Sequence, residues 1–182
     1  YRANAQRAQM QQTYANYTDY LLGLDMHAEI RDFDPVALPR IVQLTNKSNQ
    51  FNLTTRRYTQ SEMEQIAADD KHIRLYGRLR DKFGDNGIVS VVIGEISGDT
   101  LHIELAMLDT LVAACRAQNI RSICGYYNQT AKNGMVRDLF GKFGFTKMEQ
   151  FENGDSTWHM DVAGYNNLNH VIQVNEKEHQ KA

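Results

Sequence analysis

The chain has 182 residues, of which 42% are hydrophobic and 23% charged, a composition that suits one compact globular domain or slightly more. Its 20 Lys and Arg residues nearly balance 22 Asp and Glu residues, so we expect no nucleic-acid partner, since that would need a basic surface. We expect no membrane partner either, because no apolar run approaches the roughly 18 residues of a membrane-spanning helix. The two cysteines do not form a disulfide framework, which favours a reducing compartment, the cytoplasm.

The first elements expected along the chain are helical. Residues 1–24 are rich in Ala, Gln and Arg and contain no Pro, which is helix composition, and Thr18 is the expected cap of their last turn. Because helix composition starts at Tyr1, we expect the chain to be a piece of a longer polypeptide. Residues 25–31 alternate between polar and apolar side chains and predict a strand.

Two helix starts follow. Asp34 before Pro35 combines a capping carboxylate with a proline at the first helical position, which predicts a helix with an apolar face. Thr59 and Glu62 have the spacing of a capping box, which predicts another helix over residues 60–68. These helices, the strand and a polar segment over residues 40–58 make up an N-terminal part, 1–70.

The sequence changes character after residue 71. His72–Lys82 and Ile88–Ile96 are strand-like, and the turn residues Gly84–Gly87 between them predict an antiparallel hairpin. The elements expected next are a helix ending near Asn119, a strand over 120–127, a helix over 133–143 and a hairpin of strands 145–151 and 156–162. This β-β-α-β-α-β-β core, 71–163, precedes a polar tail, 164–182, whose Val171, Ile172 and Val174 are expected to dock as one edge element. The predicted fold class is α+β, a mostly antiparallel central sheet flanked by helices, with a helical N-terminal extension.

The densest polar signal lies in residues 43–57, where almost every side chain is neutral-polar or basic and none is acidic. Amides and hydroxyls both donate and accept hydrogen bonds, and the cations of this segment add positive charge, so it suits a phosphate or a polyol. The alternative is a polar loop whose amides satisfy its own backbone.

Two shorter motifs stand at expected turns. Thr130–Gly134 follows a strand at a helix start, where unpaired N–H groups favour an anionic or carbonyl ligand, although ordinary capping by Asn133 or Thr130 is the alternative. Gly84–Gly87 is interpreted as a turn, with Asp85 as a structural or catalytic carboxylate as the alternative.

Cysteine and histidine give weaker signals. Cys115 and Cys124 fall in apolar stretches of an expected helix and strand, which indicates core positions. The six histidines are scattered, with no pair at i, i+3 or i+4, so we expect no metal site.

Four runs resemble, in this order, the C-terminal domain of FkbH-like proteins. They are Arg40–Tyr58 (RIVQLTNKSNQFNLTTRRY), Arg80–Gly87 (RDKFGDNG), Thr130–Asn133 (TAKN) and Gly144–Phe145. The likeness covers nearly the whole chain to about Val162, and it implies an acetyltransferase-like (GNAT) fold. FkbH-like proteins usually join this domain to an N-terminal phosphatase-like domain of the haloacid dehalogenase type, whose Asp-x-Asp-x-Thr motif does not occur here.

The resemblance also implies a function. FkbH-like proteins take a glyceryl unit from a phosphorylated glycerate, hold it as a thioester and load it onto an acyl carrier protein for polyketide or tetronate biosynthesis. The expected partners are the acyl carrier protein and the phosphatase-like domain of the same polypeptide. No cofactor is expected to be bound in this domain: phosphopantetheine or coenzyme A donates or accepts the acyl group, and Mg²⁺ belongs to the phosphatase-like domain. The rivals are a coenzyme A-dependent N-acyltransferase acting on an amino sugar and a non-catalytic module that docks the carrier protein.

On this interpretation the polar motifs form the site. Asn133 is the expected amide that activates the thioester carbonyl, as in an oxyanion hole. The expected substrate-binding residues are Gln43, Asn46, Lys47, Asn49, Gln50, Asn52, Thr54, Thr55, Arg56, Asp85, Thr130 and Lys132.

Two features depart from the family pattern. Before the helix that ends near Asn119, the family has a strand and loop reading approximately Leu-Met-Ser-Cys-Arg-Val-x-Gly-Arg, whose Cys is the expected thioester nucleophile, whereas here Glu104 runs directly into Leu105. Three explanations are open: the segment is deleted, a mobile loop is missing from the sequence at this point, or Asp99 caps a helix from residue 100. The likeness to the family favours the missing loop. In addition, ordinary acetyltransferases often have a Tyr where Phe140 stands, so a phenolic acid is not expected there.

Overall fold

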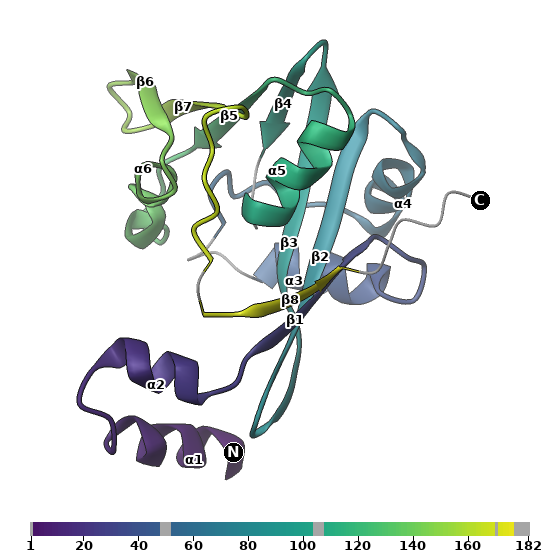
Figure 1. The fold of residues 1–182 in the computed structure, drawn as a ribbon. Helices are drawn as coiled ribbons and strands as arrows, with labels where there is room; N and C mark the ends of the chain where they lie inside the picture. The colour runs from purple at the N-terminus through teal and green to yellow at the C-terminus, as the bar shows by residue number, and fades with distance from the viewer. Residues whose placement is uncertain (1, 48–51, 104–107, 170, 177–182) are drawn as a thin grey trace.

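The computed structural model describes residues 2–47, 52–103, 108–169 and 171–176, which form a mixed sheet with helices on both faces (Figure 1). The strands are β1 (His27–Asp32), β2 (His72–Asp81), β3 (Gly84–Ser97), β4 (Thr100–Ile103), β5 (Ser122–Tyr127), β6 (Thr146–Gln150), β7 (Ser156–Asp161) and β8 (Gln173–Glu176). The helices are α1 (Arg2–Gln11), α2 (Tyr17–Gly23), α3 (Leu38–Lys47), α4 (Gln60–Ala68), α5 (Leu108–Ala117) and α6 (Leu139–Lys142), with a 3-10 turn η1 (Gly134–Val136). The α+β prediction is confirmed.

The eight described strands run in the order β6-β7-β5-β4-β3-β2-β1-β8. The pairs β4–β5 and β1–β8 are parallel, and the other neighbours are antiparallel. In the parallel pair at the centre, Ile103 lies opposite Gly125, and β5 continues through Tyr126 and Tyr127. β5 therefore continues two residues past the register of Ile103, the last described residue of β4.

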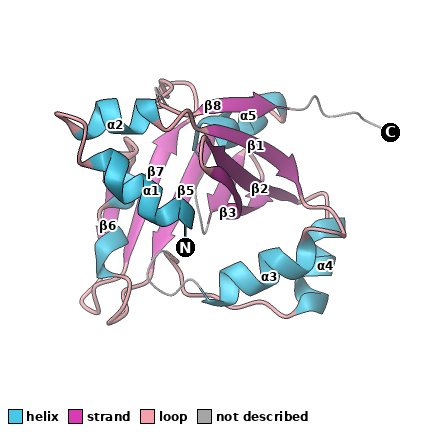
Figure 2. Cartoon of the chain, turned by 90° about the horizontal axis from the view of Figure 1, so that it is seen from below, coloured by secondary structure: helices cyan, strands magenta, loops and turns pink. Residues whose placement is uncertain are grey.

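Alternate residues of β3 face two separate cores, because successive side chains of a strand point to opposite faces of the sheet. Val92 belongs to the larger core, which α5 and α6 cover, whereas Val91 and Ile93 belong to the smaller core under α3 and α4. Figure 2 shows α3 and α4 together on one side of the strands, with α5 on the other. The sheet is thus the middle layer of the molecule.

Several local predictions are confirmed. Thr59 and Glu62 form the capping box of α4, in which the Glu62 carboxylate accepts the Thr59 N–H at 2.8 Å. The tail docks through β8, which pairs with β1 and brings Val174 opposite Ala28. The first and second hairpins form as antiparallel pairs, β2 with β3 and β6 with β7.

Some helix and turn boundaries are wrong. The cap of α2 is Asn16 rather than Thr18, since the Asn16 side chain accepts the N–H of Asp19. Asp34 caps a turn rather than α3 itself, so α3 begins at Leu38. The turn of the first hairpin comes before residues 84–87, which already belong to β3 and pair with β2 through shifts of register.

Two further predictions are wrong in secondary structure. Residues 100–103 form strand β4, which excludes a helix beginning at Thr100 and adds a strand to the predicted core order. The helix predicted over 133–143 is divided into η1 and the short α6. Two glycines, Gly134 and Gly141, lie in this stretch and weaken a continuous helix.

The N-terminal extension packs beside the far end of the β2–β3 hairpin (Figure 1). The Arg7 guanidinium of α1 binds the Asp81 carboxylate at 2.7 Å and the Asn86 side chain at 2.9 Å. Burial raises the pKa of Asp81, but hydrogen bonds from Arg7, the Phe83 N–H and Asn86 hold that pKa below its ordinary value.

In the described part of the chain, no helix has the length and apolar character needed to cross a membrane.

Candidate functional site

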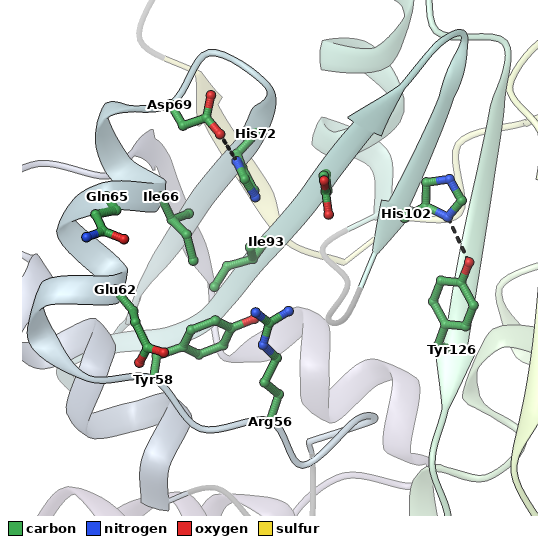
Figure 3. A pocket seen from close by; sticks show the side chains of 11 residues that line it. Arg56, Tyr58, Glu62, Gln65, Ile66, Asp69, His72, Ile93, His102 and Tyr126 are labelled. Carbon is green, nitrogen blue, oxygen red and sulfur yellow. Dashed lines mark hydrogen bonds and ion pairs between the residues drawn. The ribbon is translucent and has the colours of Figure 1, made fainter.

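A groove of about 720 Å³ opens on the α3 and α4 side of the sheet, between α4 and the strands β2 to β5 (Figure 3). The groove borders the smaller core, because Ile93 of that core forms part of the groove wall. The side chains that line the groove are Arg56, Tyr58, Glu62, Gln65, Ile66, Asp69, His72, Ile93, Glu95, His102 and Tyr126.

The floor of the groove is a row of polar side chains on neighbouring strands. His72 of β2 lies opposite Glu95 of β3, and Glu95 lies opposite His102 of β4. His102 in turn lies opposite Cys124 of β5, so one face of the sheet carries four ionisable groups in register. Residues directly opposite each other on adjacent strands point to the same face, which is why they gather although the sequence scatters them.

His102 and Tyr126 form a hydrogen-bonded pair at one end of this floor. The His102 Nδ1 atom and the Tyr126 hydroxyl are 2.8 Å apart, and the two rings are stacked with centroids 5.9 Å apart (Figure 3). Burial, and next the nearby Cys124 thiol, raise the pKa of the Tyr126 phenol, so it remains protonated at neutral pH.

The opposite wall is rich in carboxylates. Glu62 and Asp69 come from α4 and its end, and Asp69 binds His72 at 2.9 Å. A hydrogen bond from the Thr59 N–H lowers the pKa of Glu62, and one from the Lys71 N–H lowers that of Asp69, so both are ionised at neutral pH. With Glu95, three carboxylates of the described residues line the groove, beside the guanidinium of Arg56.

Arg56 reaches the groove from the polar segment that precedes α4. Its guanidinium lies over the Tyr58 ring, 4.9 Å from the centroid, and Figure 3 shows it directed into the groove. Asn46 of α3 fixes Tyr58, because its side chain donates to the Tyr58 carbonyl at 2.7 Å and accepts the Tyr58 N–H at 3.1 Å.

The part of the same segment around Asn52 and Leu53 is anchored at the carboxyl end of β5. Leu53 is fully buried in the larger core, and its carbonyl accepts the N–H of Asn128 at 2.8 Å. Asn52 closes a turn by accepting the N–H groups of Thr54 and Thr55. The segment therefore passes from the end of β5 to the groove wall.

No protein-family model matches the chain, and no curated protein matches it. Solved structures do resemble it. The ribosomal-protein-S18-alanine N-acetyltransferase from Escherichia coli has a TM-score of 0.52 at 10% identity, covering 79% of this chain and 99% of that one. Ard1 from Thermoplasma volcanium has a TM-score of 0.53 at 16% identity, covering 74% of this chain and 97% of that one. The GNAT domain of S. lividans PAT has a TM-score of 0.51 at 14% identity, covering 72% and 89%.

This chain has the GNAT fold. The predicted acetyltransferase-like architecture is confirmed at the level of the fold.

Of the residues predicted to bind substrate in the GNAT domain, Arg56 lines the groove. The side-chain amides of Asn46 and Asn52 form hydrogen bonds with the backbone of their own segment. This agrees with the alternative interpretation, a polar loop whose amides satisfy its own backbone. Gln43 and Lys47 are exposed on α3. Asn49 and Gln50 lie outside the described residues.

The two threonines of the segment differ in their contacts. Thr55 has a positive φ of 55° and donates its hydroxyl to the Thr54 carbonyl. The Thr54 hydroxyl oxygen is buried and has no hydrogen-bond partner among the described residues. Neither side chain belongs to the groove lining.

Asn133 is fully buried, and its amide is saturated with hydrogen bonds. The oxygen accepts from the Tyr127 hydroxyl at 3.2 Å and the Thr130 N–H at 2.8 Å. The nitrogen donates to the carbonyls of Asn52 at 3.2 Å and Asn128 at 2.9 Å. With both donors and both acceptor positions occupied, this amide ties the polar segment to the end of β5 instead of facing the groove.

The remaining predicted residues lie apart from the groove. Thr130 is half-buried, and its hydroxyl accepts the N–H of Lys132, whose side chain is exposed. Asp85 is exposed near the far end of the β2–β3 hairpin, where it pairs with Arg78. The Arg78 hydrogen bond and the Gly87 N–H lower the pKa of Asp85 to about 2, so it is a surface ion-pair partner rather than a buried carboxylate.

The expected nucleophilic loop would lie between Glu104 and Leu105, which are consecutive in the full sequence. Residues 104–107 lie outside the described residues. Of the two cysteines, Cys115 is buried in the larger core, where burial raises the pKa of its thiol to about 12. Cys124 is half-buried on the groove face of β5 rather than in a core, and burial also raises its pKa.

Sequence patterns missed most of the groove. His72, Glu95, His102 and Tyr126 come from four strands, and their proximity depends on the strand register, which spacing along the chain does not reveal. Polar and apolar residues alternate in β4, but its four residues are too few for the alternation to identify a strand. Within the described ranges, no three His, Cys, Asp or Glu side chains are grouped as metal ligands.

Proposed function

We propose that this domain is an acyltransferase that moves a glyceryl group between thioesters, with the phosphopantetheine thiol of an acyl carrier protein as the acceptor. The GNAT fold supports acyl transfer in general, since the similar structures include N-acetyltransferases. The glyceryl unit, the carrier protein and a phosphatase-like domain on the same polypeptide rest on the resemblance of residues 40–58 to FkbH-like proteins.

One observation carries this proposal. The segment with the family resemblance brings Arg56 to a groove whose floor holds the His102–Tyr126 pair. A guanidinium is a planar multiple donor, which suits the hydroxyls of a glyceryl group or a phosphate that accompanies it. The site therefore combines an acyl-recognition group with groups that can hold and release protons.

The carboxyl end of β5 fits the thioester arm. Tyr126 and Tyr127 extend β5 beyond Ile103, the last described residue of β4. A pantetheine arm carries amide groups that need backbone partners, and the main chain at this end of β5 can supply them. The arm would then end beside His102, with its thioester at the groove floor.

Transfer between two thiols needs no nucleophile on the domain itself. The acceptor sulfur attacks the thioester carbonyl, the new C–S bond forms, and the old C–S bond breaks as the donor thiol leaves. The domain contributes by orienting both thiols and by handling the proton, which is consistent with a chain in which Glu104 directly precedes Leu105.

A second candidate is N-acyl transfer to an amine, and the charge of the groove favours it. Glu62, Asp69 and Glu95 place three carboxylates around the space beside Arg56, an arrangement that attracts a cation. An amino sugar or another primary amine would suit this wall better than a phosphorylated acid would.

Intact-protein mass spectrometry distinguishes the candidates. The chain is incubated with glyceryl-S-pantetheine and a holo acyl carrier protein, and in parallel with acetyl-coenzyme A and a panel of amino sugars. Glyceryl transfer to the carrier supports the first candidate, whereas acetylated amine with unmodified carrier replaces it by the second. Carrier binding without transfer of either acyl group would indicate a docking module and refute both acyltransferase candidates.

Two variants locate the activity. Arg56→Gln should lower glyceryl transfer at least about tenfold, since a charged hydrogen bond contributes roughly 1.5–3 kcal/mol. Arg121→Gln is the matched control, because Arg121 is a guanidinium at the opposite end of β5 and is 83% exposed. Equal transfer by both variants would contradict the assignment of the groove as the acyl site.

A further inference from the structure

His102 and Tyr126 stand out because two proton-carrying groups share one short hydrogen bond at the groove floor. They come from adjacent parallel strands, β4 and β5, and both line the groove. The 2.8 Å contact joins Nδ1 of the imidazole to the phenol oxygen, so Nε2 is the ring nitrogen not engaged in this contact. An imidazole with one nitrogen fixed in this way can pass a proton between its two sides.

We infer that His102 and Tyr126 form a proton relay that carries the acceptor's proton to the leaving thiolate during acyl transfer. The inference rests on the proposed acyltransferase function and adds to it the residues that move the proton. It applies to a thiol acceptor and equally to an amine acceptor.

The step balances as follows. The acceptor S–H gives its proton to Nε2 of a neutral His102 while its sulfur forms the bond to the carbonyl carbon. The Nδ1 proton of His102 passes to the Tyr126 oxygen, and the Tyr126 hydroxyl proton passes to the donor sulfur as the old C–S bond breaks. The acyl group has changed thiols, one proton has moved from acceptor to donor, and Tyr126 is again a neutral phenol. His102 ends as the other tautomer.

The surroundings favour a protonated Tyr126 phenol and a fixed hydrogen bond between Tyr126 and His102. The phenol remains protonated because burial and Cys124 disfavour its ionised form. The stacking of the two rings, with planes 17° apart, holds the donor–acceptor geometry. The other titratable or charged groups that face the pair, from the floor and across the groove, are Arg56, Tyr58, Glu62, Asp69, His72, Glu95 and Cys124.

Leaving-group dependence tests the relay. Tyr126→Phe preserves the ring and removes the acid, so transfer from a pantetheine thioester should fall about 100-fold. With a nitro-substituted thiophenyl thioester, whose thiolate leaves without a proton, the same variant should lose less than about fivefold. His102→Gln removes the base and should lose about 100-fold with both donors.

His159→Gln is the matched control, since His159 lies opposite Cys124 on β7 and does not line the groove, and it should retain wild-type rates. Equal losses by Tyr126→Phe with both thioesters, or wild-type rates in either relay variant, would overturn the relay. A wild-type protein without acyl transfer to a thiol or an amine would refute the proposed function and the relay together.

A measurement that does not depend on turnover distinguishes failure of the relay from failure of the proposed function. Long-range ¹H–¹⁵N spectra report the tautomer of His102 in the resting protein. The relay requires the Nδ1–H form, with Nδ1 donating to the Tyr126 oxygen, and a change of the tautomer populations in Tyr126→Phe. An Nε2–H form in the wild-type protein would overturn the relay even if acyl transfer is observed.

Discussion

Asn133→Ala tests whether this amide is a structural tie or part of the chemistry. The substitution removes four hydrogen bonds and leaves the Tyr127 hydroxyl, the Thr130 N–H and the carbonyls of Asn52 and Asn128 without this partner. Each buried polar group left unsatisfied costs about 1–3 kcal/mol, and partial relaxation recovers some of this, so we expect a loss of about 3–5 kcal/mol. The polar segment should also loosen at its anchor to β5.

Urea denaturation followed by circular dichroism measures the free energy of unfolding of Asn133→Ala and the wild-type protein. Asn133→Asp is a useful companion, because it keeps the shape and the acceptor oxygen but turns the donor into an anion that faces two carbonyls. We expect both variants to be destabilised. A loss below about 1 kcal/mol together with abolished acyl transfer would refute the structural assignment and restore the oxyanion role.

Two further predictions concern packing and pH. A Cβ atom at Gly125 would lie 2.4 Å from the Phe140 ring, so Gly125→Ala should destabilise the fold by about 1–3 kcal/mol in urea denaturation, and an unchanged midpoint would contradict this packing. Arg7→Gln removes the partner of Asp81, whose side chain is 4% exposed, and should lower stability by about 2 kcal/mol at pH 7. Because the folded-state pKa of Asp81 is depressed, its contribution is present above the ordinary carboxyl pKa and is lost as pH falls through the lower folded value. The difference between Arg7→Gln and the wild-type protein should therefore shrink below about pH 4, and a constant difference would contradict the ion pair.

The sequence allowed the elements with strong local chemistry to be predicted. The capping box of α4 follows from side-chain spacing, and the antiparallel pairing of β2 with β3 follows from two strand-like runs separated by a short stretch. Strand β4 was not among the predicted core elements because it has four residues, too few for alternation to be distinguished from one turn of a helix. The late helix was overestimated because its apolar positions are periodic although the chain makes only η1 and α6 there.

The candidate site was less predictable than the fold. The polar segment was identified by composition, but composition does not distinguish an amide that binds a ligand from one that closes a turn, as Asn52 does. Arg56 was predicted and lines the groove, whereas Glu95, His102 and Tyr126 join it through cross-strand register. Register is a tertiary property, since it depends on which strands become neighbours.

Binding of an unreactive substrate analogue tests the central claim most directly. A glyceryl-pantetheine thioether is titrated into ¹⁵N-labelled protein, and amide chemical shifts are followed residue by residue. The account predicts shifts concentrated at Arg56, His102 and Tyr126. Shifts confined to the smaller cavity beside α5, around Asp109 and Tyr165, or no shifts at saturating analogue, would contradict it.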